Sequence, residues 1–120
     1  GLVSGGFHET VDRLAEQLGV DYVKANRLEI KQGLLTGQVL GEIVTKDTKL
    51  AMLNAWAAEN NLELNQTIAM GDGANDLSMI QAAGMGIAFM AKPIVREQAP
   101  YQIQERNLYR VIDLLDNRKE

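Results

Sequence analysis

The sequence predicts an α/β fold in which helices cover both faces of a doubly wound parallel sheet. Short apolar runs alternate with amphipathic stretches of about ten residues, an order typical of parallel strands connected by helices. Three unusual loops, SGGF, GDGAND and MAKP, each follow one of the apolar runs. Ligands of such sheets bind beyond the carboxyl ends of the strands, so these loops indicate a functional site.

The chain opens with part of a strand and a complete helix. Residues 1–3 read as the end of a buried strand that leads into a Gly-Gly turn, so we expect the strand to begin before residue 1. Four apolar residues at helical spacing then predict a helix that starts at His8 and stops at Gly19.

A hairpin and a second helix are expected next. The hairpin has two arms, Arg27–Lys31 and Leu34–Val39, because β-branched and apolar residues are interrupted there by glycines. Asp47 or Thr48 can cap the helix that follows, and this helix is expected to end near Asn60.

The second half alternates regularly between strands and helices, as a parallel sheet requires. Gly84 is expected to end the first of these helices, and Pro93 precedes the second. The expected strands are residues 66–70, 85–89 and 101–104, and the expected helices are residues 75–84, 94–99 and 108–118.

Composition limits the class of protein and its partners. The 120 residues, 46% of them hydrophobic, are material for one domain. The net charge of −4 and the lack of a Lys/Arg cluster argue against a nucleic-acid partner. The lack of cysteine excludes disulfides and thiolate metal ligands. No apolar run approaches the roughly 18 residues of a membrane span, so a cytoplasmic protein is expected.

The GDGAND loop contains oxygen ligands suited to a hard metal ion. Gly71 and Gly73 allow a tight turn and a close approach to a ligand. Asp72, Asn75 and Asp76 supply carboxylate and amide oxygens, the ligand type that Mg²⁺ selects. The loop therefore predicts a metal-assisted phosphate site. The alternative interpretation is that Asp72 and Asn75 stabilise a turn and cap the next helix.

Ser4 and Lys49 are candidate ligands for a phosphate group. A hydroxyl and glycine N–H groups at a strand end can hold a phosphoryl oxygen, although Ser4 could equally be a helix cap. Lys49 stands near a helix start, where the helix dipole disfavours a cation unless an anion lies nearby. The alternative is that Lys49 is an ordinary solvated lysine, and Lys46 is a second candidate for the phosphate-binding role. His8, the only histidine, is expected at the surface rather than as a catalytic base.

The order of these motifs resembles the haloacid dehalogenase (HAD) superfamily of phosphatases. SGGF, a lysine at the start of a helix, and GDGANDLSMIQAAGMGIAFMAKP look like the second, third and fourth motifs of that superfamily. The resemblance covers essentially the whole chain and is strongest to the branch that hydrolyses phosphoserine. It implies a Rossmann-like core with a β-hairpin insertion.

The resemblance also implies that these motifs converge on one phosphate group and one Mg²⁺. Lys49 would neutralise charge between the phosphate and the nucleophile, and Asp76 would support a metal-bound water or Lys49. Asp72 would be a direct metal ligand. The implied phosphate-binding residues are Ser4, Gly5, Lys49 and Asn75. The implied metal ligands are Asp72 and Asp76, and the implied catalytic residues are Lys49 and Asp76.

One part of the family pattern is missing. The first motif is an Asp-x-Asp pair whose first acid forms an aspartyl-phosphate, and a cap that selects phosphoserine follows it. The chain contains neither. We therefore expect residues 1–120 to be the carboxyl-terminal part of the core of a Mg²⁺-dependent phosphoserine phosphatase of serine biosynthesis, inactive by itself. The alternative is a silent fragment that binds Mg²⁺ and phosphate or docks with a partner. An uncovered sheet edge predicts self-association.

Overall fold

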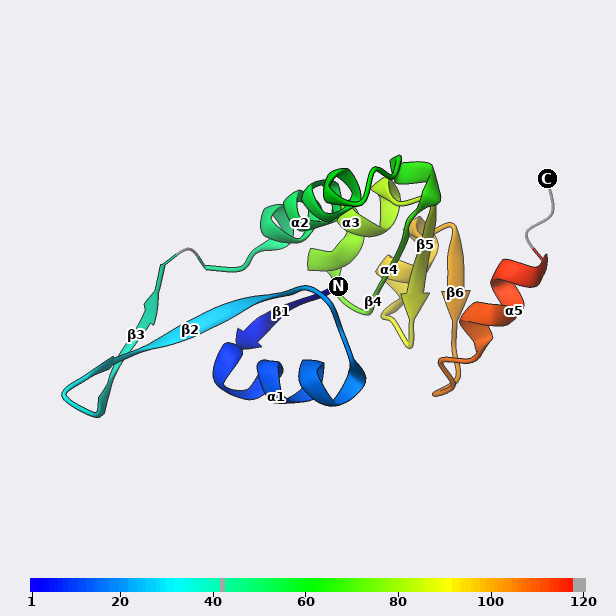
Figure 1. Ribbon diagram of the computed structural model, residues 1–120. Helices are drawn as coiled ribbons and strands as arrows, with labels where there is room; N and C mark the ends of the chain where they lie inside the picture. The colour runs from blue at the N-terminus through cyan, green and yellow to red at the C-terminus, as the bar shows by residue number, and fades with distance from the viewer. Residues whose placement is uncertain (42, 118–120) are drawn as a thin grey trace. The chain divides into compact units, whose positions relative to one another are not determined.

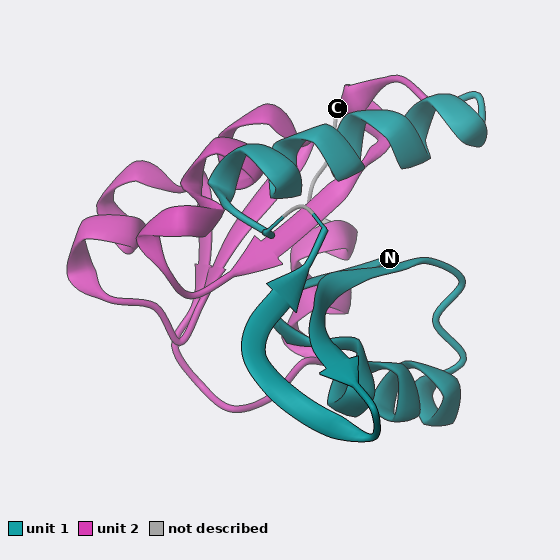
Figure 2. Ribbon diagram, turned by 90° about the vertical axis from the view of Figure 1, so that its left-hand side faces the viewer, with its two compact units in different colours: residues 1–61 teal, residues 62–120 magenta. Residues whose placement is uncertain are grey.

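The computed structural model describes residues 1–41 and 43–117. Helices and strands alternate along the chain, and parallel strand pairs occur throughout, which confirms the predicted α/β class. The chain divides into two compact units, Gly1–Asn61 and Leu62–Glu120, which Figure 2 colours separately. Each unit contains one three-stranded sheet. Among the described residues, no helix combines the length and apolarity that crossing a membrane needs.

The first unit consists of three strands and two helices. Its elements in chain order are β1 (Leu2–Phe7), α1 (His8–Leu18), β2 (Val23–Lys31), β3 (Leu34–Leu40) and α2 (Lys46–Glu59). The amino-terminal half of β2 pairs in parallel with β1, and its carboxyl-terminal half pairs antiparallel with β3. The second pairing forms the long hairpin in Figure 1. The predicted helix at His8 and the predicted hairpin are both confirmed.

The SGGF segment lies within β1 and is not a turn after the strand, which corrects the prediction. Pairing between β1 and β2 is regular at Leu2 and Val3 and then shifts register before Phe7. Glycine in a strand commonly marks such an irregularity, because it has no side chain to keep the pleat regular. The strand therefore continues through the glycines with a local break in its ladder.

The cap of α2 also differs from the prediction. Thr45, rather than Asp47 or Thr48, is the N-cap residue. Its hydroxyl accepts a hydrogen bond from the Thr48 N–H at 3.5 Å, and the Thr48 hydroxyl accepts one from the Thr45 N–H at 3.1 Å. This reciprocal pair forms a capping box, with Thr48 in the place that glutamate or glutamine usually holds. The predicted end near Asn60 is confirmed, since Asn60 is the C-cap residue.

The second unit is a parallel sheet with order β4-β5-β6 and helices between its strands (Figure 1). Its strands are β4 (Ile68–Gly71), β5 (Met85–Phe89) and β6 (Tyr101–Ile103), and its helices are α3 (Leu77–Ala82), α4 (Pro93–Gln98) and α5 (Arg110–Asn117). Short 3₁₀ turns cover Leu64–Gln66 and Ala74–Asp76.

All three predicted strands of the second unit are confirmed, and the helices differ from the prediction at their ends. The first helix starts two residues later than predicted, because a 3₁₀ turn occupies residues 74–76. It ends at Ala82 rather than Gly84. The Gly84 N–H donates instead to the carbonyl oxygen of Leu64 at 2.7 Å. The predicted end of the last helix, Arg118, lies outside the described residues.

The core of the second unit lies on both faces of β5. Alternate residues of the strand enter two hydrophobic clusters, one against α3 and α4 and one against β6 and α5. A Cβ added to Gly86 would overlap the carbonyl group of Ile80, so glycine allows α3 to approach β5 closely. Four large side chains are fully buried, each worth roughly 1.5–3 kcal/mol of burial. They are Ile80, Met85, Ile87 and Val95.

The first unit buries smaller apolar side chains than the second. The core contributes less hydrophobic stabilisation there, because that stabilisation grows with the apolar area removed from water. Its buried apolar residues are Ala15, Ala25, Val44 and Ala57. Its buried polar residues are Asn26 and Lys49. Hydrogen bonds to buried polar groups therefore carry more of the local order in this unit.

Candidate functional site

Ser4 and Gly5 lie where β1 loses its regular pairing with β2. The Ser4 hydroxyl oxygen accepts a hydrogen bond from the Gly6 N–H at 3.0 Å. Ser4 is not the cap of α1, because the N-cap residue is Phe7 and no side chain caps that helix end. A Cβ added to Gly5 would find no atom within 4 Å, so space beside this backbone is open. An anion could therefore approach the backbone at Gly5 closely.

Lys49 is buried and its rival Lys46 is exposed. Lys49 lies in the first turn of α2 and is 8% exposed, whereas Lys46, the first residue of the same helix, faces solvent. A lysine is rarely buried unless its charge is compensated. Burial therefore separates the two candidates and favours Lys49 as the lysine with a specific role.

His8 has a structural place at the start of α1. Its Nδ1 lies 2.6 Å from an Asp12 carboxylate oxygen, and its Nε2 accepts a hydrogen bond from the Ala25 N–H at 3.2 Å. This arrangement fits the neutral ring with its proton on Nδ1. The ring joins α1 to β2, and its side chain is only 14% exposed, so the expectation of a surface residue is wrong.

The Asp76 carboxylate organises the GDGAND loop. Asp76 is 5% exposed, and its Oδ2 accepts hydrogen bonds from the N–H groups of Asp72 and Gly73, both at 3.1 Å. A Cβ on Gly71 would overlap this carboxylate. The glycine therefore permits the close approach of Asp76 to the turn, whereas the sequence predicted a close approach to a ligand. Asp76 and the backbone of Asp72 are brought together as one compact loop.

Asp72 is exposed at the carboxyl end of β4 and lines a cavity of about 420 Å³. The cavity lies at the ends of β4 and β5, where the parallel sheet predicts a ligand site. Its other lining residues are Met70, Gly71, Phe89, Met90 and Arg106. Asn75 is exposed on the 3₁₀ turn of the same loop. No sequence signal indicated Arg106, because that residue lies in an irregular segment after β6.

The donor set of this loop fits Mg²⁺. Within residues 1–41 and 43–117, no group of three or more His, Cys, Asp or Glu side chains is placed to enclose a metal ion. Mg²⁺ usually takes one or two carboxylates and leaves its other positions to water and phosphate. Asp72 and Asp76 supply two carboxylates joined by one loop, so they could hold this ion without a full protein cage.

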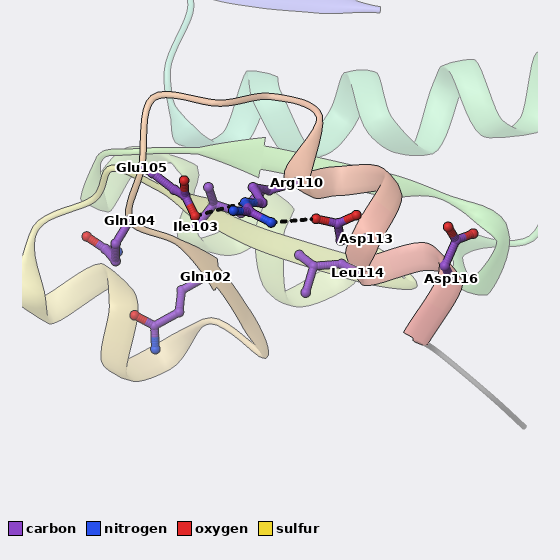
Figure 3. A pocket seen from close by; sticks show the side chains of 8 residues that line it. All are labelled: Gln102, Ile103, Gln104, Glu105, Arg110, Asp113, Leu114 and Asp116. Carbon is purple, nitrogen blue, oxygen red and sulfur yellow. Dashed lines mark hydrogen bonds and ion pairs between the residues drawn. The ribbon is translucent and has the colours of Figure 1, made fainter.

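A second cavity, of about 680 Å³, lies between β6 and α5 and is not part of the predicted site. Figure 3 shows Arg110 in it, between Glu105 and Asp113, at 2.8 and 2.9 Å from their carboxylate oxygens. Hydrogen bonds to Asp113 and to Glu105 raise the pKa of Arg110 above its usual range. The arginine is already charged at neutral pH, so the raised pKa does not change its charge there. The ion pairs hold the start of α5 to Glu105.

Comparison with known proteins identifies the family. The model of the haloacid dehalogenase-like hydrolases matches residues 1–81. A phosphoserine phosphatase of Streptococcus thermophilus is 73% identical over 116 residues, which are 97% of this chain and 54% of that protein. A phosphoserine phosphatase of Lactococcus lactis is 53% identical over the same lengths. The chain spans about half the length of these curated relatives.

Solved structures agree with this assignment. A crystal structure of a probable phosphoserine phosphatase from Vibrio cholerae matches with a TM-score of 0.90 at 46% identity, over 95% of this chain and 35% of that one. A phospho-aspartyl intermediate analogue of phosphoserine phosphatase matches with a TM-score of 0.86, also at 46% identity, over 93% and 54% of the two chains. The family model, the relatives and the fold agree, and the chain belongs to the haloacid dehalogenase-like hydrolases.

Proposed function

We propose that this chain is the phosphate- and metal-binding part of a Mg²⁺-dependent phosphoserine phosphatase, which converts O-phosphoserine into serine and phosphate. The GDGAND loop carries the proposal, because its buried Asp76 is bonded to the backbone of the loop that presents Asp72. The 73% identity to a phosphoserine phosphatase supports this substrate. We propose that it acts as a cytoplasmic enzyme of serine biosynthesis, in which residues 1–120 form the carboxyl-terminal part of the core.

Ser4, Gly5, Lys49 and Asn75 are proposed to bind the phosphate group. The Ser4 hydroxyl keeps its hydrogen as a donor while its oxygen accepts from the Gly6 N–H. The Lys49 ammonium is a buried cation, and charge on phosphoryl oxygens is stabilised most strongly by fixed donors that are shielded from water. These groups can therefore meet the charge that spreads over the phosphoryl oxygens during transfer.

Asp72 and Asp76 are proposed as the acidic residues of the metal site. Asp72 is the direct ligand, and Asp76 fixes the loop and supports the ion's surroundings. When bound, Mg²⁺ supplies positive charge that polarises a phosphoryl oxygen. The exposed Asp72 is reachable for an ion that also contacts substrate, whereas Asp76 is anchored by two backbone N–H groups.

The second candidate function is that of a chain without a nucleophile of its own, since residues 1–120 contain no Asp-x-Asp pair. The sequence by itself then binds Mg²⁺ and phosphate, or docks with a partner, without hydrolysis. Both candidates share the same binding residues. They differ in whether a nucleophilic carboxylate is brought to the bound phosphate group.

A graft distinguishes these candidates. In the Streptococcus thermophilus phosphoserine phosphatase, this chain replaces the 116 matching residues, and phosphate release from phosphoserine is measured with Mg²⁺. We expect the grafted enzyme to hydrolyse phosphoserine and the isolated chain to release none. A grafted enzyme that folds but is inactive would support the silent fragment, and turnover by the isolated chain would contradict the need for a missing nucleophile.

Self-association through the hairpin is proposed as well. Three large apolar side chains of the β2–β3 hairpin, Ile30, Leu34 and Leu35, are each more than half exposed. Exposed apolar residues on an edge strand favour contact with another chain. Size-exclusion chromatography with light scattering is expected to show a dimer or larger species, and replacing Leu34 and Leu35 by Gln should shift it to monomer. A monomer for the unaltered chain would contradict this proposal.

A further inference from the structure

A buried asparagine joins the two segments of the first unit that are proposed to bind phosphate. Asn26 lies in β2 and is 6% exposed. Its side-chain Nδ2 donates to the Gly5 carbonyl oxygen at 2.9 Å, and its Oδ1 accepts from the Val44 N–H at 2.7 Å. One amide group therefore holds β1 on one side and the residue before the cap of α2 on the other.

The bond from Asn26 to Gly5 reaches the Ser4 hydroxyl through a single peptide group. The Gly5 carbonyl and the Gly6 N–H belong to the same trans peptide, so they point in opposite directions and turn together. The Gly6 N–H donates to the Ser4 hydroxyl oxygen at 3.0 Å. A fixed Gly5 carbonyl thus fixes the donor that holds the Ser4 hydroxyl.

This link is found where the backbone itself gives little support. The pairing of β1 with β2 shifts register between Val3 and Phe7, so the peptide after Gly5 lies in the irregular part of the ladder. A glycine backbone has more freedom than any other. A hydrogen bond from a buried side chain can supply the order that the interrupted strand pairing lacks.

We propose that Asn26 is a positioning residue for phosphate binding, and that it acts through the Gly5–Gly6 peptide and the Ser4 hydroxyl. The inference rests on the proposed function of Ser4 and Gly5. With its oxygen occupied by the Gly6 N–H, the Ser4 hydroxyl directs its own hydrogen away from the backbone, toward an incoming phosphoryl oxygen. Through Val44, which precedes the N-cap Thr45, the same amide also fixes the start of the helix that carries Lys49.

Only a side chain with both a donor and an acceptor meets these two partners. Asn26→Asp keeps the acceptor for Val44 but loses the donor, and it places a carboxylate against the Gly5 carbonyl oxygen. Asn26→Ser is neutral but too short to span both partners. Each change frees the Gly5–Gly6 peptide to rotate, so the Ser4 hydroxyl loses its fixed partner.

The test follows inorganic phosphate binding to the ¹⁵N-labelled isolated chain by NMR, with the amides of Gly5 and Gly6 as probes. Asn26→Asp is expected to weaken phosphate binding about tenfold, near the upper end of the range for losing one hydrogen bond of ordinary strength to an ordered site. Hydrogen exchange at the Gly6 amide should also speed up in the phosphate-free protein. The matched control is Asn60→Asp, whose exposed amide also donates to a backbone carbonyl, that of Trp56 at 2.7 Å. It should leave both readouts unchanged.

The outcomes distinguish a failure of this inference from a failure of the proposed phosphate-binding function. A phosphate titration that leaves Gly5 and Gly6 unmoved in the unaltered chain contradicts the proposed phosphate site, and Gly6 exchange then decides the positioning role alone. Wild-type phosphate affinity and Gly6 exchange in a folded Asn26→Asp or Asn26→Ser protein would overturn the inference. If neither variant folds, the side-chain amide of Asn26 in the unaltered chain decides: it should shift together with Gly6 on phosphate binding, and an unmoved signal would overturn the inference.

Discussion

Lys49→Met is expected to lower kcat/KM for phosphoserine by about 10²–10³-fold in the grafted enzyme, the loss typical of removing one preorganised group that stabilises transition-state charge. Methionine keeps the length of the side chain and removes only the ammonium. Because Lys49 is buried, no water can fully replace its charge at the phosphoryl oxygens. The measurement is steady-state phosphate release from phosphoserine.

Lys46→Met is the matched control for this change. It makes the same substitution in the same helix turn, at a residue that faces solvent. It should change kcat/KM less than about twofold, because exposed charges are screened by water and salt. Equal losses in both variants, or a larger loss for Lys46→Met, would show that the wrong lysine has been assigned.

Asp76→Asn is expected to lower kcat/KM in the grafted enzyme by about 10–100-fold, the range for groups that support a metal site. The amide can still accept from the N–H groups of Asp72 and Gly73, but it has lost the negative charge that supports the cation. Asp76→Ala should additionally lower the free energy of unfolding by about 1–3 kcal/mol, because two backbone donors of the loop lose their partner. Kinetics and urea unfolding measure the two effects.

Asp116→Asn serves as the control in the same unit. Asp116 is exposed on α5, and replacing it by Asn makes the same change of charge away from the GDGAND loop. It should leave both kinetics and unfolding unchanged. Full activity and full stability in Asp76→Ala would show that its bonds to the loop backbone have no functional weight.

The sequence predicted most of the fold because periodicity reports which faces of a helix or strand are buried. The strand at Met85–Phe89 was predicted at its observed ends, since its apolar run is buried on both faces. Errors arose where hydrogen bonds rather than burial decide. Thr45 and Thr48 cap each other reciprocally, and this pairing cannot be read from either residue alone. The register shift in β1 likewise depends on its partner strand.

The candidate site could be predicted in its residue types but not in its supporting bonds. Asp72 and Asp76 stood out as acids in a glycine-rich turn. Their different surroundings, one exposed and one buried against the backbone, required the structure. Asn26 had no sequence signal as a support for Gly5, because its partner lies 21 residues away in the chain. Spacing reveals local contacts, whereas such bonds arise only from the packing of distant segments.

We propose above all that the GDGAND loop holds Mg²⁺ for phosphate transfer from phosphoserine. The most direct test measures phosphate release by the grafted enzyme as a function of free Mg²⁺, with and without Asp72→Asn. We predict saturable activation that disappears when EDTA removes the metal, and a large increase in the Mg²⁺ concentration needed by Asp72→Asn. Metal-independent turnover, or the same Mg²⁺ requirement in the variant, would contradict the proposed metal site.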